Sequence, residues 1–268
     1  MYWRFSRWQR SLHAALFTGF VVAALTGLPL RFSAQPWAAT LCTLLGGVAT
    51  LRWLHRGAAL LLGGCAVAHV ATLLYLLGRR PGLPRGPDSL LPQRRDGHDL
   101  WQHLRWLLGQ APPPAFERWT YWQKFDYWAA MLGLVGMGSS GLVVWLAPLV
   151  TRWLPGWAVT VSLRLHGHEA VLALGVISVF HFFHAHLRPG KFPADLAMFT
   201  GRVEEAALRR EHARYYARLQ QSGRLAPLRA APPPRWLVRL GRWLGWLPVA
   251  LCWLLWLLVL WSLMAGAE

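Results

Sequence analysis

The 268-residue chain is 55% hydrophobic and only 15% charged, yet it carries 18 tryptophans and a formal net charge of +17. A soluble domain of this length has more charge and fewer apolar runs of membrane-spanning length, so the composition excludes an ordinary soluble protein. The basic residues crowd into segments between the apolar runs, as the positive-inside rule describes. This pattern explains the charge without a nucleic-acid partner.

We predict an all-α integral membrane protein with five spans. In chain order the elements are a span at about 12–30, an interfacial helix at 37–51, spans at 54–77, 126–147 and 165–187, and a C-terminal transmembrane helix at 243–268. Residues 1–187 form a four-helix bundle, interrupted by a cytoplasmic loop at 78–124. A hydrophilic cytoplasmic segment at 188–242 links the bundle to the last helix.

The distribution of Lys and Arg predicts the orientation. These residues concentrate at the N-terminus and in the segments 78–124 and 188–242, whereas the connections 31–53 and 148–164 carry few. The positive-inside rule therefore predicts a cytoplasmic N-terminus and an extracytoplasmic C-terminus.

Five histidines lie within two apolar runs: His55 and His69 on one, and His166, His168 and His181 on the other. A titratable ring in hydrocarbon is costly and is usually kept there by a partner or a metal. Two helical residues fourteen apart lie within about 40° of one face and about 21 Å apart. The pattern therefore suits two stacked haems, as in a membrane cytochrome b.

The predicted topology places His55 and His166 near the outer face, and we assign them as one haem-binding pair. His168 lies about 140° from His181 around the helix, which puts it on the wrong side. The inner haem needs two of four candidates: His13, His69, His181 and His184. Two axial imidazoles leave no open position on the iron, which is typical of electron transfer.

Several motifs resemble a known family. RFS at 4–6, followed by Gln9, Arg10 and His13, and LTGLP at 25–29 are similar to the first helix of the formate-dehydrogenase and nickel-hydrogenase cytochrome b subunits. LHRGAA at 54–59 is similar to their second helix. A closer resemblance is to di-haem cytochrome b proteins associated with multihaem cytochromes c: YWQKFDYW at 121–128, His166 with Glu169 and Ala170, and the motif spread over 181–201.

The resemblance covers about residues 4–219 and implies a four-helix haem-binding bundle with two haem b groups. By resemblance, His55 and His166 hold the outer haem, and His13 and His181 hold the inner one. The implied function is that of an electron-transfer subunit of a quinone/cytochrome oxidoreductase complex in a bacterial inner membrane. Its substrate would be quinone or menaquinone, and its partner a multihaem cytochrome c or another periplasmic redox subunit.

His69 departs from the formate-dehydrogenase pattern, and four roles stay open for it. It replaces His13 as an inner ligand, serves a third haem, forms a hydrogen bond with a haem propionate or a quinone, or is an ordinary core histidine. His184 and His186 lie near the membrane interface, where they are either further haem ligands or lipid contacts.

Charged residues near the histidines are candidates for binding haem propionates or a quinone, with lipid anchoring as the alternative. The cations are Arg56 and Arg164 at the outer pair, and Arg10, Lys124 and Arg188 in the inner region. Glu169 lies within an apolar span, where it either pairs with an arginine or relays protons. Asp126 is a candidate proton acceptor beside a quinone, although an ordinary ion pair explains it as well.

Two rival functions remain. The spacing of His181, His184 and His186, and the stretch from His98 to His103, superficially resemble the histidine boxes of membrane di-iron desaturases or hydroxylases. The sequence lacks a third box, and His181 lies too deep for a centre at the membrane surface. The other rival is a non-catalytic, haem-containing membrane anchor.

Overall fold

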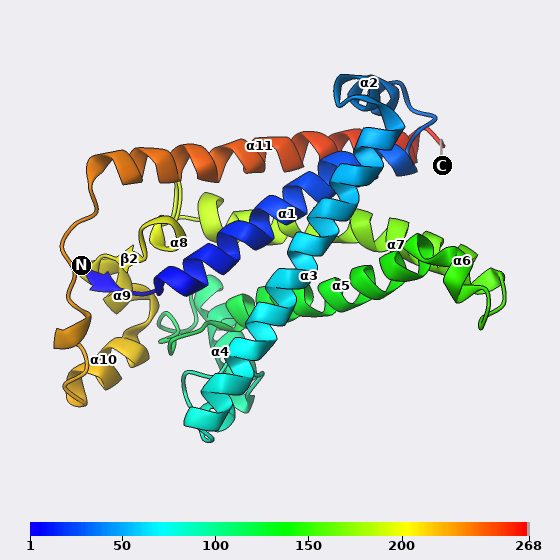
Figure 1. The fold of residues 1–268 in the computed structure, drawn as a ribbon. Helices are drawn as coiled ribbons and strands as arrows, with labels where there is room; N and C mark the ends of the chain where they lie inside the picture. The colour runs from blue at the N-terminus through cyan, green and yellow to red at the C-terminus, as the bar shows by residue number, and fades with distance from the viewer. Residues whose placement is uncertain (267–268) are drawn as a thin grey trace. The chain divides into compact units, whose positions relative to one another are not determined.

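The computed structural model describes residues 1–266, most of which are helical (Figure 1). Within these residues, five helical runs are long and apolar enough to cross a membrane: α1 (Arg7–Arg31), α3 (Gly47–Arg79), α5 (Tyr121–Trp145), the run Trp157–Leu187, and α11 (Arg235–Met264). The predicted helical architecture with five spans is confirmed, and it indicates a multi-pass membrane protein.

The fourth run is not one regular helix. It begins as α7 (Trp157–Gly175) and continues through two π-helical segments, η2 (Val176–His181) and η3 (Phe183–Leu187). The remaining helices are short: α2 (Pro36–Leu44), η1 (Leu83–Arg85), α4 (Arg94–Leu107), α6 (Ala147–Val150), α8 (Ala197–Thr200), α9 (Glu205–Glu211), α10 (Ala213–Gln221) and η4 (Ala226–Leu228). Strands β1 (Tyr2–Trp3) and β2 (Arg202–Val203) pair antiparallel, with Tyr2 opposite Val203.

Two glycines divide the segment predicted as one interfacial helix at 37–51. Helix α2 ends at Leu44, and the residues from Gly47 onward belong to α3. Gly46 and Gly47 have φ angles of 88° and 87°. Glycine adopts this left-handed backbone at low cost, and such a residue ends a helix. The second span therefore begins earlier than the predicted residue 54.

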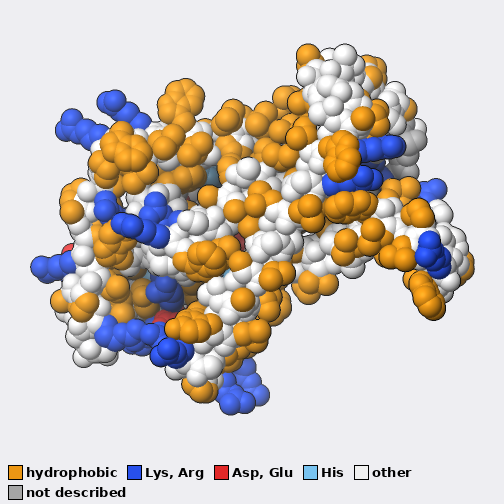
Figure 2. Space-filling view, viewed as in Figure 1, with side chains coloured by type: hydrophobic (Ala, Val, Ile, Leu, Met, Phe, Trp, Pro, Cys, Tyr) orange, Lys and Arg blue, Asp and Glu red, His pale blue; other side chains and the backbone are white. Residues whose placement is uncertain are grey.

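The chain divides into two compact units. Unit one comprises Met1–Arg10, Ala68–Ala130 and Leu196–Arg239; unit two comprises Ser11–Val67, Met131–Asp195 and the described part of Leu240–Glu268. The core of unit two joins side chains of α1, α7 and α11, among them Leu28, Leu174, Val249 and Val259. Hydrophobic side chains also cover much of the visible surface (Figure 2), as lipid contact requires.

Unit one joins the predicted loop 78–124 to the predicted linker 188–242. Its apolar cluster consists of Tyr2, Leu208, Tyr215, Tyr216 and Leu219. Ion pairs between the two segments reinforce this cluster, so the segment 188–242 is a folded part of the protein rather than only a linker.

Three of these ion pairs involve the carboxylates of Asp99, Asp88 and Glu117. Asp99 is 3% exposed and accepts a 2.6 Å hydrogen bond from Arg214. Arg218 lies 2.5 Å from Asp88 and 3.1 Å from Glu117. Elsewhere in the unit, hydrogen bonds from Tyr216 and Arg209 lower the pKa of the Glu205 carboxyl.

The same N-terminal cap begins α1 and α5. At α1, Ser6 Oγ accepts a 3.2 Å bond from the Gln9 backbone N–H, and Gln9 Oε1 accepts a 3.0 Å bond from the Ser6 backbone N–H. At α5, Thr120 and Gln123 repeat both bonds at 3.3 Å and 3.1 Å. These are capping boxes. Each residue of the second box lies 114 positions after its counterpart in the first.

The residues before the two caps contact one another within unit one. Arg4 donates a hydrogen bond to the backbone carbonyl of Arg118, and Arg118 donates one to the carbonyl of Arg4. The rings of Phe5 and Trp119 lie 6.1 Å apart. Arg118 and Trp119 again lie 114 positions after Arg4 and Phe5. The starts of α1 and α5 therefore contact each other through equivalent residues, as in a pseudo-two-fold arrangement.

We expect Asp99→Asn to lower the free energy of unfolding by about 1–3 kcal/mol, because a buried carboxylate that accepts bonds from Arg214 is replaced by a neutral amide. Thermal unfolding of the full chain in detergent measures the change. Glu204→Gln is the control, since Glu204 is an exposed carboxylate of the same unit. Equal midpoints for the two variants would contradict a stabilising role of the Asp99–Arg214 pair.

Candidate functional site

Two pairs of histidines face one another within unit two. The rings of His55 on α3 and His166 on α7 lie 6.0 Å apart, centroid to centroid. The rings of His13 on α1 and His181 at the end of η2 lie 6.4 Å apart. The structure thus brings together the two pairs that the sequence resemblance suggested.

The His55 ring is held by α1. Its Nδ1 lies 3.2 Å from the carbonyl oxygen of Ala23 and 3.2 Å from Thr26 Oγ1. A carbonyl oxygen only accepts, so Nδ1 carries the hydrogen and Nε2 keeps its lone pair. The Thr26 hydroxyl donates to the carbonyl of Val22 at 2.6 Å, which leaves its oxygen free to accept from Nδ1. At Gly27, a Cβ atom would lie 2.7 Å from Cε1 of His55, so the ring needs a glycine there.

The His166 ring is held by α5 in the same way. Its Nδ1 lies 3.1 Å from the carbonyl oxygen of Met137 and 3.2 Å from Ser140 Oγ. The Ser140 hydroxyl donates to the carbonyl of Gly136 at 2.8 Å. At Gly141, a Cβ atom would lie 3.0 Å from Cε1 of His166. His166 is therefore also fixed with its lone pair on Nε2, the form in which imidazole binds a metal.

The residues of α1 and α5 that hold the rings of His55 and His166, which we call the two collars, belong to an internal repeat. Met137, Ser140 and Gly141 lie 114 positions after Ala23, Thr26 and Gly27, the same offset as between the two capping boxes. The sequence reasoning missed this repeat. The signal was present as a Ser/Thr-x-x-Gln cap followed by a Ser/Thr-Gly-Leu motif at one spacing in both helices.

The π-helical segment η2 accounts for a difference of one residue in histidine spacing between the two copies of the repeat. His166 and His181 are fifteen residues apart, whereas His55 and His69 are fourteen apart. A π turn takes one residue more than an α turn, so the longer spacing covers an equivalent length of helix. His181 is therefore the counterpart of His69. Because η2 is π-helical, the angle between His166 and His181 around the helix axis does not follow from a regular α-helical wheel.

Arg31 is a basic residue near the outer pair that the sequence reasoning missed. A Cβ atom at Gly167, the residue after His166, would meet its guanidinium, and its Nε is buried with no partner among the described residues. A guanidinium with an unused donor suits a carboxylate ligand. Arg31 ends α1, and the sequence alone gave no reason to place it beside α7.

The two cations predicted at the outer pair, Arg56 and Arg164, have different surroundings from those of Arg31. The Arg56 guanidinium lies 5.7 Å from the ring of Trp53 and 5.2 Å from that of Trp145, in cation–π contacts. Arg164 is exposed, and its carbonyl oxygen lies 2.7 Å from Nδ1 of His168. His168 is itself exposed, so it is not part of either pair.

Glu169 lies one turn beyond His166 on α7. A Cβ atom at Gly136 would lie 2.5 Å from its Oε1, and its Oε2 is buried with no partner among the described residues. The carboxyl group therefore packs against the glycine-rich face of α5. The structure shows no arginine paired with it in the part of the chain that is described.

The predicted polar residues of the inner region mostly bind backbone or carboxylate groups. Arg10 donates to the carbonyl of Phe199 and, at 3.3 Å, to that of Met198. Lys124 donates to Asp96 at 2.9 Å rather than lying free beside Asp126. Both cations thus hold neighbouring segments of unit one, and they are again 114 positions apart.

The histidines near the end of the fourth span lie in aromatic surroundings. The His184 ring lies 4.7 Å from the ring of Phe180. The backbone carbonyl of His184 accepts a 3.1 Å hydrogen bond from Nε of Arg188. His186 is 7% exposed, lies 6.4 Å from the ring of Trp246, and its Nδ1 has no partner among the described residues.

His69 lies against a tyrosine. Its Nε2 is 2.9 Å from the hydroxyl oxygen of Tyr127 on α5, and the two rings are 5.6 Å apart. The structure thus gives His69 a protein partner on α5, and the roles that the sequence left open for it stay predictions.

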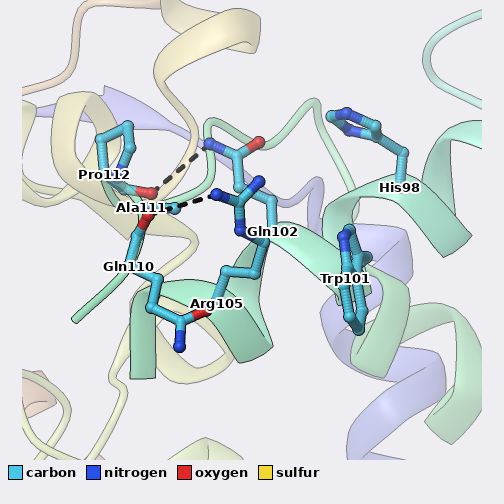
Figure 3. A pocket seen from close by; sticks show the side chains of 7 residues that line it. All are labelled: His98, Trp101, Gln102, Arg105, Gln110, Ala111 and Pro112. Atoms are coloured by element: carbon cyan, nitrogen blue, oxygen red, sulfur yellow. Dashed lines mark hydrogen bonds between the residues drawn. The ribbon is translucent and has the colours of Figure 1, made fainter. Parts of the chain in front are cut away.

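A surface pocket lies elsewhere, on α4 and the turn that follows it (Figure 3). Its lining residues are His98, Trp101, Gln102, Arg105, Gln110, Ala111 and Pro112. Weak hydrogen bonds of 3.4 Å join Gln102 to the Pro112 carbonyl and Arg105 to the Gln110 carbonyl. The pocket contains none of the predicted site residues. Among the residues described, no group of three or more His, Cys, Asp or Glu side chains is arranged to bind one metal ion.

Comparison with protein-family models and with curated protein sequences found no match.

We expect Gly27→Ala to lower the free energy of unfolding by about 1–3 kcal/mol, because the added methyl group displaces the His55 ring. Gly133→Ala is a matched control within a span, since a Cβ atom there meets nothing within 4 Å. It should be neutral or stabilise by less than about 1 kcal/mol. Thermal unfolding in detergent compares the two variants, and equal destabilisation would show that the collar around His55 has no special steric demand.

Proposed function

We propose that this protein is a membrane b-type cytochrome subunit that passes electrons across a membrane between a quinone and an extracytoplasmic redox partner. The observation that carries the proposal is the matched pair His55 and His166. Each ring has its Nδ1 hydrogen held by a backbone carbonyl of a neighbouring helix, and the rings lie 6.0 Å apart. His13 and His181 are the second pair.

The spacing of the rings fits iron. An imidazole nitrogen binds a transition metal at about 2 Å, so two imidazoles on opposite sides of one iron have centroids about 6 Å apart. The separations of 6.0 Å and 6.4 Å agree with this expectation. The unused Nε of Arg31 also suits a group with carboxylate substituents. A b-type haem would supply a one-electron redox centre at each pair.

The residues of the chain determine what such centres do. The residues His55 with His166, and His13 with His181, would hold one haem each, and a centre held by two imidazoles would supply electron transfer rather than substrate binding. Their hydrogen-bonded Nδ1 atoms fix the tautomer and raise the basicity of Nε2. No catalytic side chain is assigned.

The two pairs lie at different levels of one helical run. Because η2 is π-helical, the fifteen residues from His166 to His181 cover about the length of fourteen α-helical residues, about 21 Å, against a hydrocarbon core of about 30 Å. Electrons passed between the two levels therefore cross most of the membrane. The basic segments favour a cytoplasmic N-terminus in a bacterial inner membrane. The family resemblance favours a multihaem cytochrome c as the partner.

We expect His166→Ala to remove the outer haem and leave the inner one, so that haem per chain falls by about half. His168→Ala is the control, because His168 is exposed two residues away and bonds only to its own helix. Haem quantification with redox titration of the purified chain measures both. Retention of two haems in His166→Ala would refute the pairing, and a colourless wild-type protein would refute the function.

The inner pair has a separate test. His13→Ala should lower haem content and abolish one redox transition, because His13 faces His181. His69→Ala should leave haem content unchanged, because His69 is bonded to Tyr127. The reverse result would assign His69 as the inner ligand.

A further inference from the structure

The internal repeat relates the inner histidine pair to a second pair of side chains. His13 corresponds to Tyr127 by the offset of 114, and His181 corresponds to His69 through the matched helices α3 and α7. The repeat of the pair His13–His181 is therefore the pair Tyr127–His69. The outer pair has no such second copy, because its two histidines are each other's counterparts.

The second pair is too close to hold iron. Two atoms bound on opposite sides of one metal ion lie about 4 Å apart. In contrast, His69 Nε2 and the Tyr127 hydroxyl oxygen are 2.9 Å apart, which is a direct hydrogen bond. Tyr127 stands where the other copy of the repeat has His13, so this second pair is hydrogen-bonded and does not hold a metal. The Tyr127 oxygen keeps a lone pair that can accept a further hydrogen bond.

Both members of this pair are half-buried side chains of helices long and apolar enough to cross a membrane. The exposed side chains of Val70, Leu74 and Tyr75 lie on other sides of α3, about 100°, 140° and 240° around the helix from His69. The pair is thus only partly covered by protein, within an apolar span. On another side, Trp8 donates a 3.0 Å bond to Thr72, one turn beyond His69, so α1 contacts the same stretch of α3.

The lysine nearest to this pair on α5 is already engaged. Lys124, one turn before Tyr127, is 6% exposed and binds Asp96 at 2.9 Å and the Leu91 carbonyl at 3.2 Å. The pair itself offers the hydrogen-bonding groups of a phenol and an imidazole. This suits an uncharged, lipid-soluble ring that carries hydroxyl or carbonyl oxygens.

We propose that Tyr127 and His69 bind the head group of a lipid quinone. The Tyr127 hydroxyl donates to Nε2 of His69, while its oxygen accepts a hydrogen bond from a quinol hydroxyl; with the oxidised form, Tyr127 donates to a ring carbonyl instead. This inference rests on the proposed function, which requires a quinone, and it assigns the quinone contact to Tyr127, the residue directly after the predicted proton acceptor Asp126.

The test measures binding of a fluorescent hydroxyquinoline N-oxide, a quinone analogue, to the full-length protein in nanodiscs, with haem content determined on the same samples. Tyr127→Phe and His69→Gln should each weaken binding about tenfold, the loss of one hydrogen bond, without changing haem content. Tyr75→Phe, an exposed tyrosine on α3, is the matched control and should bind like the wild type.

Unchanged affinity in both variants would overturn the inference, since the His69–Tyr127 bond would then only join two helices. Loss of haem in His69→Gln would also overturn it, because His69 would be an iron ligand. A wild-type protein that binds the analogue but contains no haem would sustain the quinone site while refuting the proposed electron-transfer function. The two failures are therefore distinguishable.

Discussion

The hydrogen bond from each outer histidine to a backbone carbonyl of the neighbouring helix determines the chemistry of the site. An unpaired N–H group is costly in hydrocarbon, so the bond is favoured strongly there. It places the hydrogen of His55 and of His166 on Nδ1 and the lone pair on Nε2. It also demands that the two helices approach closely, which Gly27 and Gly141 permit. The proposed haem ligation depends on this orientation, because only Nε2 is left to bind iron.

The internal repeat explains why the two ends of the site differ. Its two copies share capping boxes and collars, so the outer pair consists of equivalent histidines. At the inner end, one copy has His13 where the other has Tyr127, and the π-helical segment η2 sets the position of His181. Under the proposed function, one duplicated arrangement thus supplies a metal-ligand pair in one copy and a hydrogen-bonding pair in the other.

The strongly basic composition has two consequences in the structure. Within unit one, the few acidic residues form ion pairs: Asp96 with Lys124, Asp99 with Arg214, and Asp88 and Glu117 with Arg218. The pairs of Asp99, Asp88 and Glu117 join the loop after α3 to α10, and the Asp96–Lys124 pair joins α4 to α5. The chain has 28 Lys and Arg residues against only 11 Asp and Glu residues, a large excess of positive charge. Such an excess is what anionic lipid headgroups attract.

The sequence by itself determined the five spans and the order of the histidines along them, because only a helix satisfies its backbone in lipid and each residue advances it by about 1.5 Å. The glycines at 46–47 also showed that the second apolar stretch was unlike the others. Only the tertiary structure decided which groups meet: the Ala23 carbonyl with His55, Arg31 with α7, Lys124 with Asp96, and Tyr127 with His69. These contacts depend on the rotation and register of one helix against another, and a π turn in one helix changes both.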